Sequence, residues 1–140
     1  DLVKWQIRVA ADLPLGFKQK DIKLNGCAIE CRINAEDPAR NFCPSAGRVT
    51  LLHAPGGPWV RFDTALYQDY MIPPYYDSMI GKLIVHAQNR EQAIRKMKMA
   101  LSELVIEGVT HNADFQAQLL DNPAFVDGSY TTGLLDELGK

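Results

Sequence analysis

Three cysteines are the side chains in this sequence with the most obvious capacity for chemistry. Cys27 and Cys31 could form a disulfide or ligate a metal ion if their sulfur atoms came together. They lie in an alternating segment, however, and four strand steps would place them about 13 Å apart. We therefore expect buried, free thiols at both positions. Cys43 precedes a proline in a predicted loop, and no neighbouring base is visible that would activate its thiol.

Single serine, lysine and histidine residues do not complete a common catalytic motif. Gly81 and Lys82 resemble the end of a phosphate-binding loop, but the glycine five positions earlier and the following Ser or Thr are missing. Ser78 lacks the flanking glycines of a nucleophile elbow. The three histidines stand alone, without the spacing of metal ligands. We therefore expect no metal site in this chain.

Two polar segments remain as candidates for a functional site. Glu30, Arg32 and Asn34 alternate with apolar residues, so in a strand all three project from one face. An ordinary cross-strand ion pair of the arginine would give the same pattern. In the segment 73–79, two tyrosines and Asp77 follow two prolines. Packing of amphipathic aromatic rings at a sheet edge is the alternative there.

Four predicted strands must position these side chains. Alternation of apolar and polar residues favours a strand over residues 27–34, and shorter strands are expected over 48–53 and 59–63. The run 79–87 is apolar on both faces apart from one lysine and one histidine. Such a run is typical of a central strand.

Two predicted helices follow the strands. The segment 91–105 has an apolar stripe at helical spacing that predicts a buried face, and Gly108 is expected to end this helix. Asn112 is expected to cap the N-terminus of the second helix. Strands followed by helices indicate an α+β domain with an antiparallel β-sheet followed by packing helices. The stripe consists of Ile94, Met97, Leu101 and Leu104.

The first residues predict a helix that belongs to a preceding structural unit. Apolar residues cover most of the circumference of residues 1–11, and a polar linker follows over 18–25. The chain also begins without methionine, so we expect it to be cut from a longer polypeptide. We expect residues 1–24 to be the last helix and linker of a truncated domain, and residues 25–140 to form one further domain.

Composition argues against several classes of function. The 140 residues carry 17 acidic and 15 basic side chains, a formal net charge of −2, and are 46% apolar, as expected of a globular domain. Because there is no basic excess, nucleic acid is not an expected partner. A membrane is not expected either, because no apolar run approaches the length of a span. Three cysteines in a chain that needs no disulfides favour a reducing, cytoplasmic location.

Several longer segments together resemble the C-terminal domain of biotin carboxylase, as in bacterial acetyl-CoA carboxylase and related biotin-dependent carboxylases. They occur in the order and spacing of that family over nearly the whole chain from Asn25 onward. The N-terminal helix is similar to the one that closes the preceding ATP-grasp domain of this family. The segments are residues 30–38, 44–47, 53–57, 73–83 and 107–112.

The resemblance implies a catalytic role for Arg32. In this family ATP, magnesium and bicarbonate are used to carboxylate the N1 atom of biotin, and removal of the N1 proton leaves negative charge on the ureido oxygen. The arginine that stabilises this enolate and binds bicarbonate corresponds to Arg32. A guanidinium suits that task, because it keeps its charge and offers forked donors.

The resemblance also implies supporting roles for four further residues. Glu30, Asn34 and Asp77 are expected to orient Arg32. Arg61 corresponds to a residue of the dimer interface in bacterial relatives, although Pro58 stands where an aromatic residue often lies. The resemblance therefore implies a homodimer, with Arg61 at its interface.

The cofactors and partners implied by the resemblance lie largely outside this chain. ATP, magnesium and biotin on its carrier protein belong to the full-length ligase, and none is expected to be bound by this segment alone. The expected partners are the biotin carboxyl carrier protein and the upstream ATP-grasp domain. The isolated chain is expected to be inactive. Acetyl-CoA carboxylase, and hence fatty acid biosynthesis, is the favoured context, and a non-catalytic dimerisation or carrier-docking module is the alternative.

Overall fold

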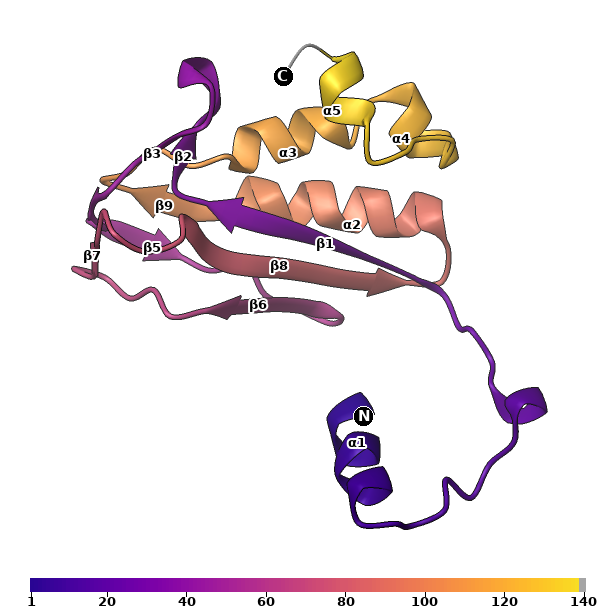
Figure 1. Ribbon diagram of the computed structural model, residues 1–140. Helices are drawn as coiled ribbons and strands as arrows, with labels where there is room; N and C mark the ends of the chain where they lie inside the picture. The colour runs from indigo at the N-terminus through magenta and orange to yellow at the C-terminus, as the bar shows by residue number, and fades with distance from the viewer. Residues whose placement is uncertain (139–140) are drawn as a thin grey trace.

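A three-stranded antiparallel sheet forms the centre of the structure, a computed structural model that describes residues 1–138. Its strands are β1 (Cys27–Asn34), β8 (Met79–Ala87) and β6 (Val60–Thr64), in the order β1-β8-β6. The central position predicted for residues 79–87 is therefore confirmed. Helix α2 (Arg90–Glu103) covers one face of this sheet, as Figure 1 shows.

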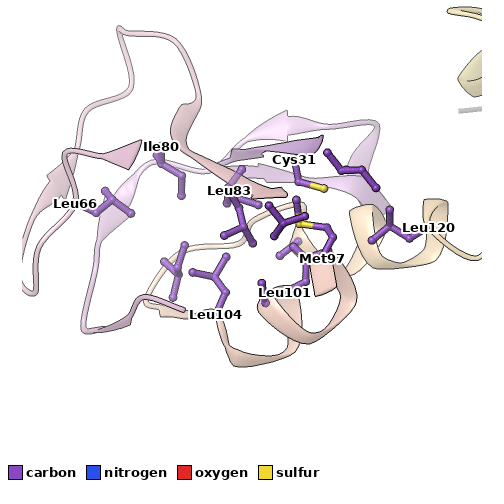
Figure 2. Packing of buried hydrophobic residues seen from close by; sticks show 14 of the residues in the cluster. Cys31, Leu66, Ile80, Leu83, Met97, Leu101, Leu104 and Leu120 are labelled. Atoms are coloured by element: carbon purple, nitrogen blue, oxygen red, sulfur yellow. The ribbon is translucent and has the colours of Figure 1, made fainter. Parts of the chain in front are cut away.

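Alternation along β1 divides the sheet into a buried and an exposed face. Cys31 and Ile33 are buried, whereas Glu30 and Arg32 are exposed, as the sequence predicts. The core lies between the sheet and α2, where Leu83 of β8 meets apolar side chains of the helix (Figure 2). All four residues of the predicted helical stripe are buried there, namely Ile94, Met97, Leu101 and Leu104.

Helix α2 ends earlier than the sequence predicts. It begins after Asn89, whose side chain accepts a hydrogen bond from the backbone of Gln92, and its last residue is Glu103. The next residues form strand β9 (Val105–Glu107), which pairs with β5 (Leu51–His53). The expectation that Gly108 ends the helix is therefore wrong. Pairing with a strand some fifty residues earlier outweighs the helical pattern of this segment.

Three shorter helices complete the C-terminal part of the described chain. They are α3 (Ala113–Leu119), α4 (Pro123–Asp127) and α5 (Leu134–Glu137). The predicted start of the second helix at Asn112 is confirmed. Its side chain, however, makes no capping hydrogen bond and is directed elsewhere.

The prediction of one continuous strand over residues 48–53 is wrong, because the two halves of this segment pair with different strands. Val49 donates its backbone hydrogen bond to Tyr70, and Thr50 donates to Glu107, both at 2.9 Å. The chain therefore leaves one strand pair and enters another. The two-stranded pairs are β2 (Glu36–Asp37) with β3 (Cys43–Pro44), β4 (Gly47–Arg48) with β7 (Met71–Ile72), and β5 with β9.

Helix α1 (Leu2–Ala10) lies apart from the sheet and its helices (Figure 1). None of its residues is buried, although most of its surface is apolar. The 3-10 turn η1 (Gln19–Asp21) lies in the linker that follows, and η2 (Pro38–Arg40) follows β2. The predicted α+β class is confirmed. The division after residue 24 stays a prediction, and Gly139 and Lys140, the end of the predicted domain 25–140, lie outside the described residues.

Candidate active site

Arg32 lies on the exposed face of the central sheet, directly opposite Lys82 of β8. The carbonyl oxygen of Arg32 accepts hydrogen bonds from the side chains of Asn112 and Gln116, so it points away from β8. Residues with this orientation form a non-hydrogen-bonded antiparallel pair, in which the side chains approach most closely. Arg32 and Lys82 are therefore neighbouring cations on one face.

Neither cation of this pair has an acidic partner within 4.0 Å in the described part of the chain. Asp63 lies beside Lys82 on β6, but its carboxylate binds the guanidinium of Arg61 at 2.8 Å. The cross-strand ion pair that the sequence left open for Arg32 is thus not formed. Like charges placed opposite each other destabilise a sheet, and a bound anion would relieve this repulsion.

The residues predicted to orient Arg32 contact other neighbours. Glu30 is exposed opposite Ile84. The side-chain amide of Asn34 donates to Glu36 Oε1 at 3.2 Å, and the hydroxyl of Ser78 donates to the same oxygen. This cluster ties the end of β1 to the start of β8. The roles of Glu30 and Asn34 toward Arg32 stay predictions.

Asp77 lies beside a cleft that extends from Lys82. Its Oδ1 accepts a hydrogen bond of 2.7 Å from the backbone of Met79, which fixes the entry into β8. The cleft has a volume of about 500 Å³, and both Asp77 and Lys82 line it. Because Lys82 is opposite Arg32, the cleft continues the face that carries the two cations. The orienting role of Asp77 stays a prediction, as does the dimer contact of Arg61.

The two tyrosines that precede Asp77 are not packed at a sheet edge. Tyr75 and Tyr76 are 79% and 77% exposed, and their ring centroids lie 5.5 Å apart. The packing alternative for this segment is therefore wrong. Two exposed aromatic rings beside the cleft offer apolar surface to a bound molecule or a neighbouring domain.

The cysteines are free thiols with very different environments. Cys31 is buried, and burial raises the pKa of its thiol to about 12, with a smaller contribution from the negative charge of Glu30. Cys27 is half-buried and Cys43 is exposed. The expectation of a buried free thiol is confirmed for Cys31 and is met only in part for Cys27.

Thiol labelling should distinguish Cys43 from Cys31. The raised pKa keeps the thiol of Cys31 protonated up to about pH 12, and only the thiolate reacts. At pH 8 we expect an alkylating reagent to modify Cys43 at least 100-fold faster than Cys31 in the folded protein. Peptide mass spectrometry of samples quenched over time measures both rates. Equal rates under native conditions, and not only in denaturant, would contradict the assignment.

The described part of the chain has neither a metal-ligand cluster nor a membrane-spanning helix. No group of three or more His, Cys, Asp or Glu side chains there could hold a metal ion. No helix of residues 1–138 has the length and apolar character needed to cross a membrane.

Lys82 is the residue of this site that sequence reasoning missed. Its neighbours in the sequence suggested only the end of a phosphate loop or a polar break in an apolar strand. A lone charged residue inside the run 79–87 was the available signal. Its meaning depended on the register, which places it opposite Arg32.

The comparison with protein families identifies the class of this domain. A family model described as biotin carboxylase C-terminal domain matches residues 30–137, which is well over half of the chain. The chain therefore belongs to the biotin carboxylase C-terminal domain family.

Curated relatives and solved structures agree with this family. The chain is 50% identical over 136 residues to biotin carboxylase 1 of Bacillus subtilis, covering 97% of this chain and 30% of that protein. It is 51% identical over 137 residues to a pyruvate carboxylase subunit of Methanothermobacter thermautotrophicus, covering 98% and 28%. The chain thus spans about 30% of the length of such relatives.

A solved structure supports the fold over almost the whole chain. The biotin carboxylase domain of 2-oxoglutarate carboxylase from Hydrogenobacter thermophilus superimposes with a TM-score of 0.90 at 45% identity, covering 98% of this chain and 30% of that one. That structure is described as a dimer in complex with MgADP, ADP and bicarbonate.

Proposed function

We propose that this chain is the part of a biotin carboxylase that presents Arg32 to biotin and bicarbonate. The unpaired cations Arg32 and Lys82 on the exposed face of the described chain are the observation that carries the proposal. Membership of the biotin carboxylase C-terminal domain family supports bicarbonate as the anion that this pair would bind, and so does the bicarbonate complex of a 45% identical domain.

The proposed reaction is the ATP-dependent carboxylation of N1 of biotin, which is carried on a carrier protein. Loss of the N1 proton shifts negative charge to the ureido oxygen. The guanidinium of Arg32 would donate hydrogen bonds to that oxygen and to bicarbonate without giving up a proton. Lys82 would add a second positive charge close by, so that the anionic state is favoured over neutral biotin.

Magnesium and nucleotide are assigned to another part of the polypeptide. The described residues include no group of three or more His, Cys, Asp or Glu side chains that could hold a metal ion, and we propose no magnesium ligand among them. We propose that an upstream ATP-grasp domain supplies those ligands. The exposed apolar surface of α1 would pack against that ATP-grasp domain.

The proposed partners are the carrier protein, the ATP-grasp domain and a second copy of the enzyme. The dimer described for the 2-oxoglutarate carboxylase domain supports the last of these. Acetyl-CoA is the proposed final acceptor, with a role in fatty acid biosynthesis in the cytoplasm. Some relatives are named as carboxylases of pyruvate or 2-oxoglutarate. An assay that compares acetyl-CoA, pyruvate and 2-oxoglutarate as final acceptors would therefore distinguish the three.

Bicarbonate-dependent release of ADP tests the proposed function. The complete polypeptide should release ADP in a reaction that requires bicarbonate and is stimulated by biotin. The 140-residue chain alone should show no turnover, because we propose that the nucleotide site lies in the ATP-grasp domain. Carboxybiotin formation from labelled bicarbonate provides the second measurement. Turnover by the isolated chain would contradict the assignment of the nucleotide site to another domain. No turnover by the complete polypeptide would contradict the proposed function and favour a docking module.

A further inference from the structure

We infer that Asn112 is a positioning residue that fixes the backbone of Arg32, and this inference rests on the proposed function. Asn112 is the one polar residue that is buried in the described part of the chain, with 5% of its surface exposed. It lies immediately before α3, yet it reaches residues about 80 positions earlier in the sequence.

Three hydrogen bonds connect Asn112 to the end of β1. Its Nδ2 donates to the carbonyl oxygen of Arg32 at 3.2 Å. Its Oδ1 accepts from the backbone N–H of Asn34 at 2.9 Å, and its own backbone N–H donates to the Asn34 carbonyl oxygen at 3.1 Å. The Nε2 of Gln116, one turn into α3, donates a second bond of 3.3 Å to the Arg32 carbonyl oxygen.

The position of these bonds explains why β1 needs them. β1 is an edge strand of its sheet, so one row of its backbone groups has no partner strand. The register with β8 also shifts between Ile33 and Asn34, one residue beyond Arg32. A register shift loosens the hold of the neighbouring strand. Asn112 and Gln116 therefore supply the restraint that the sheet does not.

The local surroundings of Asn112 point to the same conclusion. An asparagine before a helix ordinarily caps it, but this side chain makes no capping bond. The Nδ1 of His111 accepts instead from the backbone N–H of Ala113 at 3.3 Å. Burial lowers the pKa of His111, which keeps its imidazole neutral and able to accept. The Asn112 side chain can therefore form its hydrogen bonds with β1.

Holding the Arg32 backbone determines where its guanidinium can reach. The bonds from Asn112 and Gln116 hold the peptide that follows Arg32, and the residue before it, Cys31, is paired with Leu83 of β8. The Cα–Cβ direction of Arg32 is therefore fixed, and only its side-chain torsions remain free. Small displacements of a group that positions a substrate are costly, and a misplacement of about 1 Å can reduce the rate about 100-fold. The effect should appear in the use of biotin and not of ATP.

The exchange Asn112→Asp tests the donor without changing size. It keeps an acceptor for the Asn34 N–H, but it replaces the donor to the Arg32 carbonyl oxygen by a carboxylate oxygen. In the complete polypeptide we expect kcat/KM for biotin to fall about 10-fold, chiefly through a higher KM, with the KM for ATP changed less than twofold. Gln116→Ala, on the surface of α3, should raise the biotin KM about threefold without impairing folding.

Two comparisons separate positioning from a loss of stability. Asn89→Ala removes a comparable asparagine side chain, the cap of α2, and should leave the biotin KM unchanged. In an Arg32→Ser background, Asn112→Asp should lower kcat/KM for biotin less than twofold further, because the group that it positions is gone.

Each outcome decides one claim. If the wild-type polypeptide does not carboxylate biotin, the proposed function fails. If the wild type is active and Arg32→Ser impairs it, unchanged biotin KM values for Asn112→Asp and Gln116→Ala overturn the positioning role. Equal losses for ATP and biotin, or fully multiplicative losses with Arg32→Ser, overturn it as well. Should Asn112→Asp not fold, the Gln116→Ala result decides.

Discussion

Replacing Arg32 with serine should lower kcat/KM for biotin about 10²- to 10³-fold in the complete polypeptide. That is the usual cost of removing one preorganised donor to a developing oxyanion. The loss should be seen in carboxybiotin formation from labelled bicarbonate. The remaining cation, Lys82, offers a point charge and not the forked donors of a guanidinium, so it should not compensate.

The fold should survive this substitution. Arg32 is exposed, forms no ion pair with the described residues, and contributes only its backbone to the bonds with Asn112 and Gln116. Serine retains that backbone. We expect the midpoint of thermal unfolding to change by no more than about 2 °C, since exposed substitutions rarely exceed about ±0.5 kcal/mol.

Arg95→Ser is the matched control for this experiment. Arg95 lies on the outer side of α2, where it pairs only with Glu91 one turn earlier among the described residues. An exposed pair of this kind contributes little, so both activity and stability should remain near wild type. Undiminished carboxylation by Arg32→Ser would remove the catalytic assignment. An equal loss in Arg95→Ser would trace the effect to something other than the site.

Replacing Gly108 with alanine should destabilise the protein by about 3 kcal/mol or more. Gly108 has a φ of +95°, and a Cβ atom added there would lie 2.0 Å from the carbonyl oxygen of Arg48 and 3.0 Å from the backbone nitrogen of Thr50. Backbone strain and a main-chain clash add in this position. The chain between β9 and α3 would have to move away from the segment that links β4 to β5.

Chemical denaturation measures this effect against a matched glycine. Gly56 has open space around the position of an added Cβ, and its φ is not in the left-handed region. Gly56→Ala should therefore leave the denaturation midpoint nearly unchanged, whereas Gly108→Ala should lower it clearly. Equal midpoints for the two variants would show that the close approach at Gly108 does not restrain the fold.

Local sequence patterns predicted much of this fold and one part of its site. The alternation in residues 27–34 placed Arg32 on the exposed face, because period two is a property of the extended backbone itself. The two-sided apolar run 79–87 predicted the central strand. The stripe in α2 predicted the helical core face. These features depend only on neighbours a few residues apart.

Contacts between distant segments decided the rest. Lys82 became the neighbour of Arg32 only through the register of β1 with β8, fifty residues later. The side chain of Asn112 bonds to β1 and does not cap α3, and Gly108 follows a strand and not a helix. The physical reason is the same in each case. Backbone N–H and C=O groups that find no hydrogen-bond partner within their own segment bond to whichever part of the folded chain lies beside them. The local sequence does not indicate which part that will be.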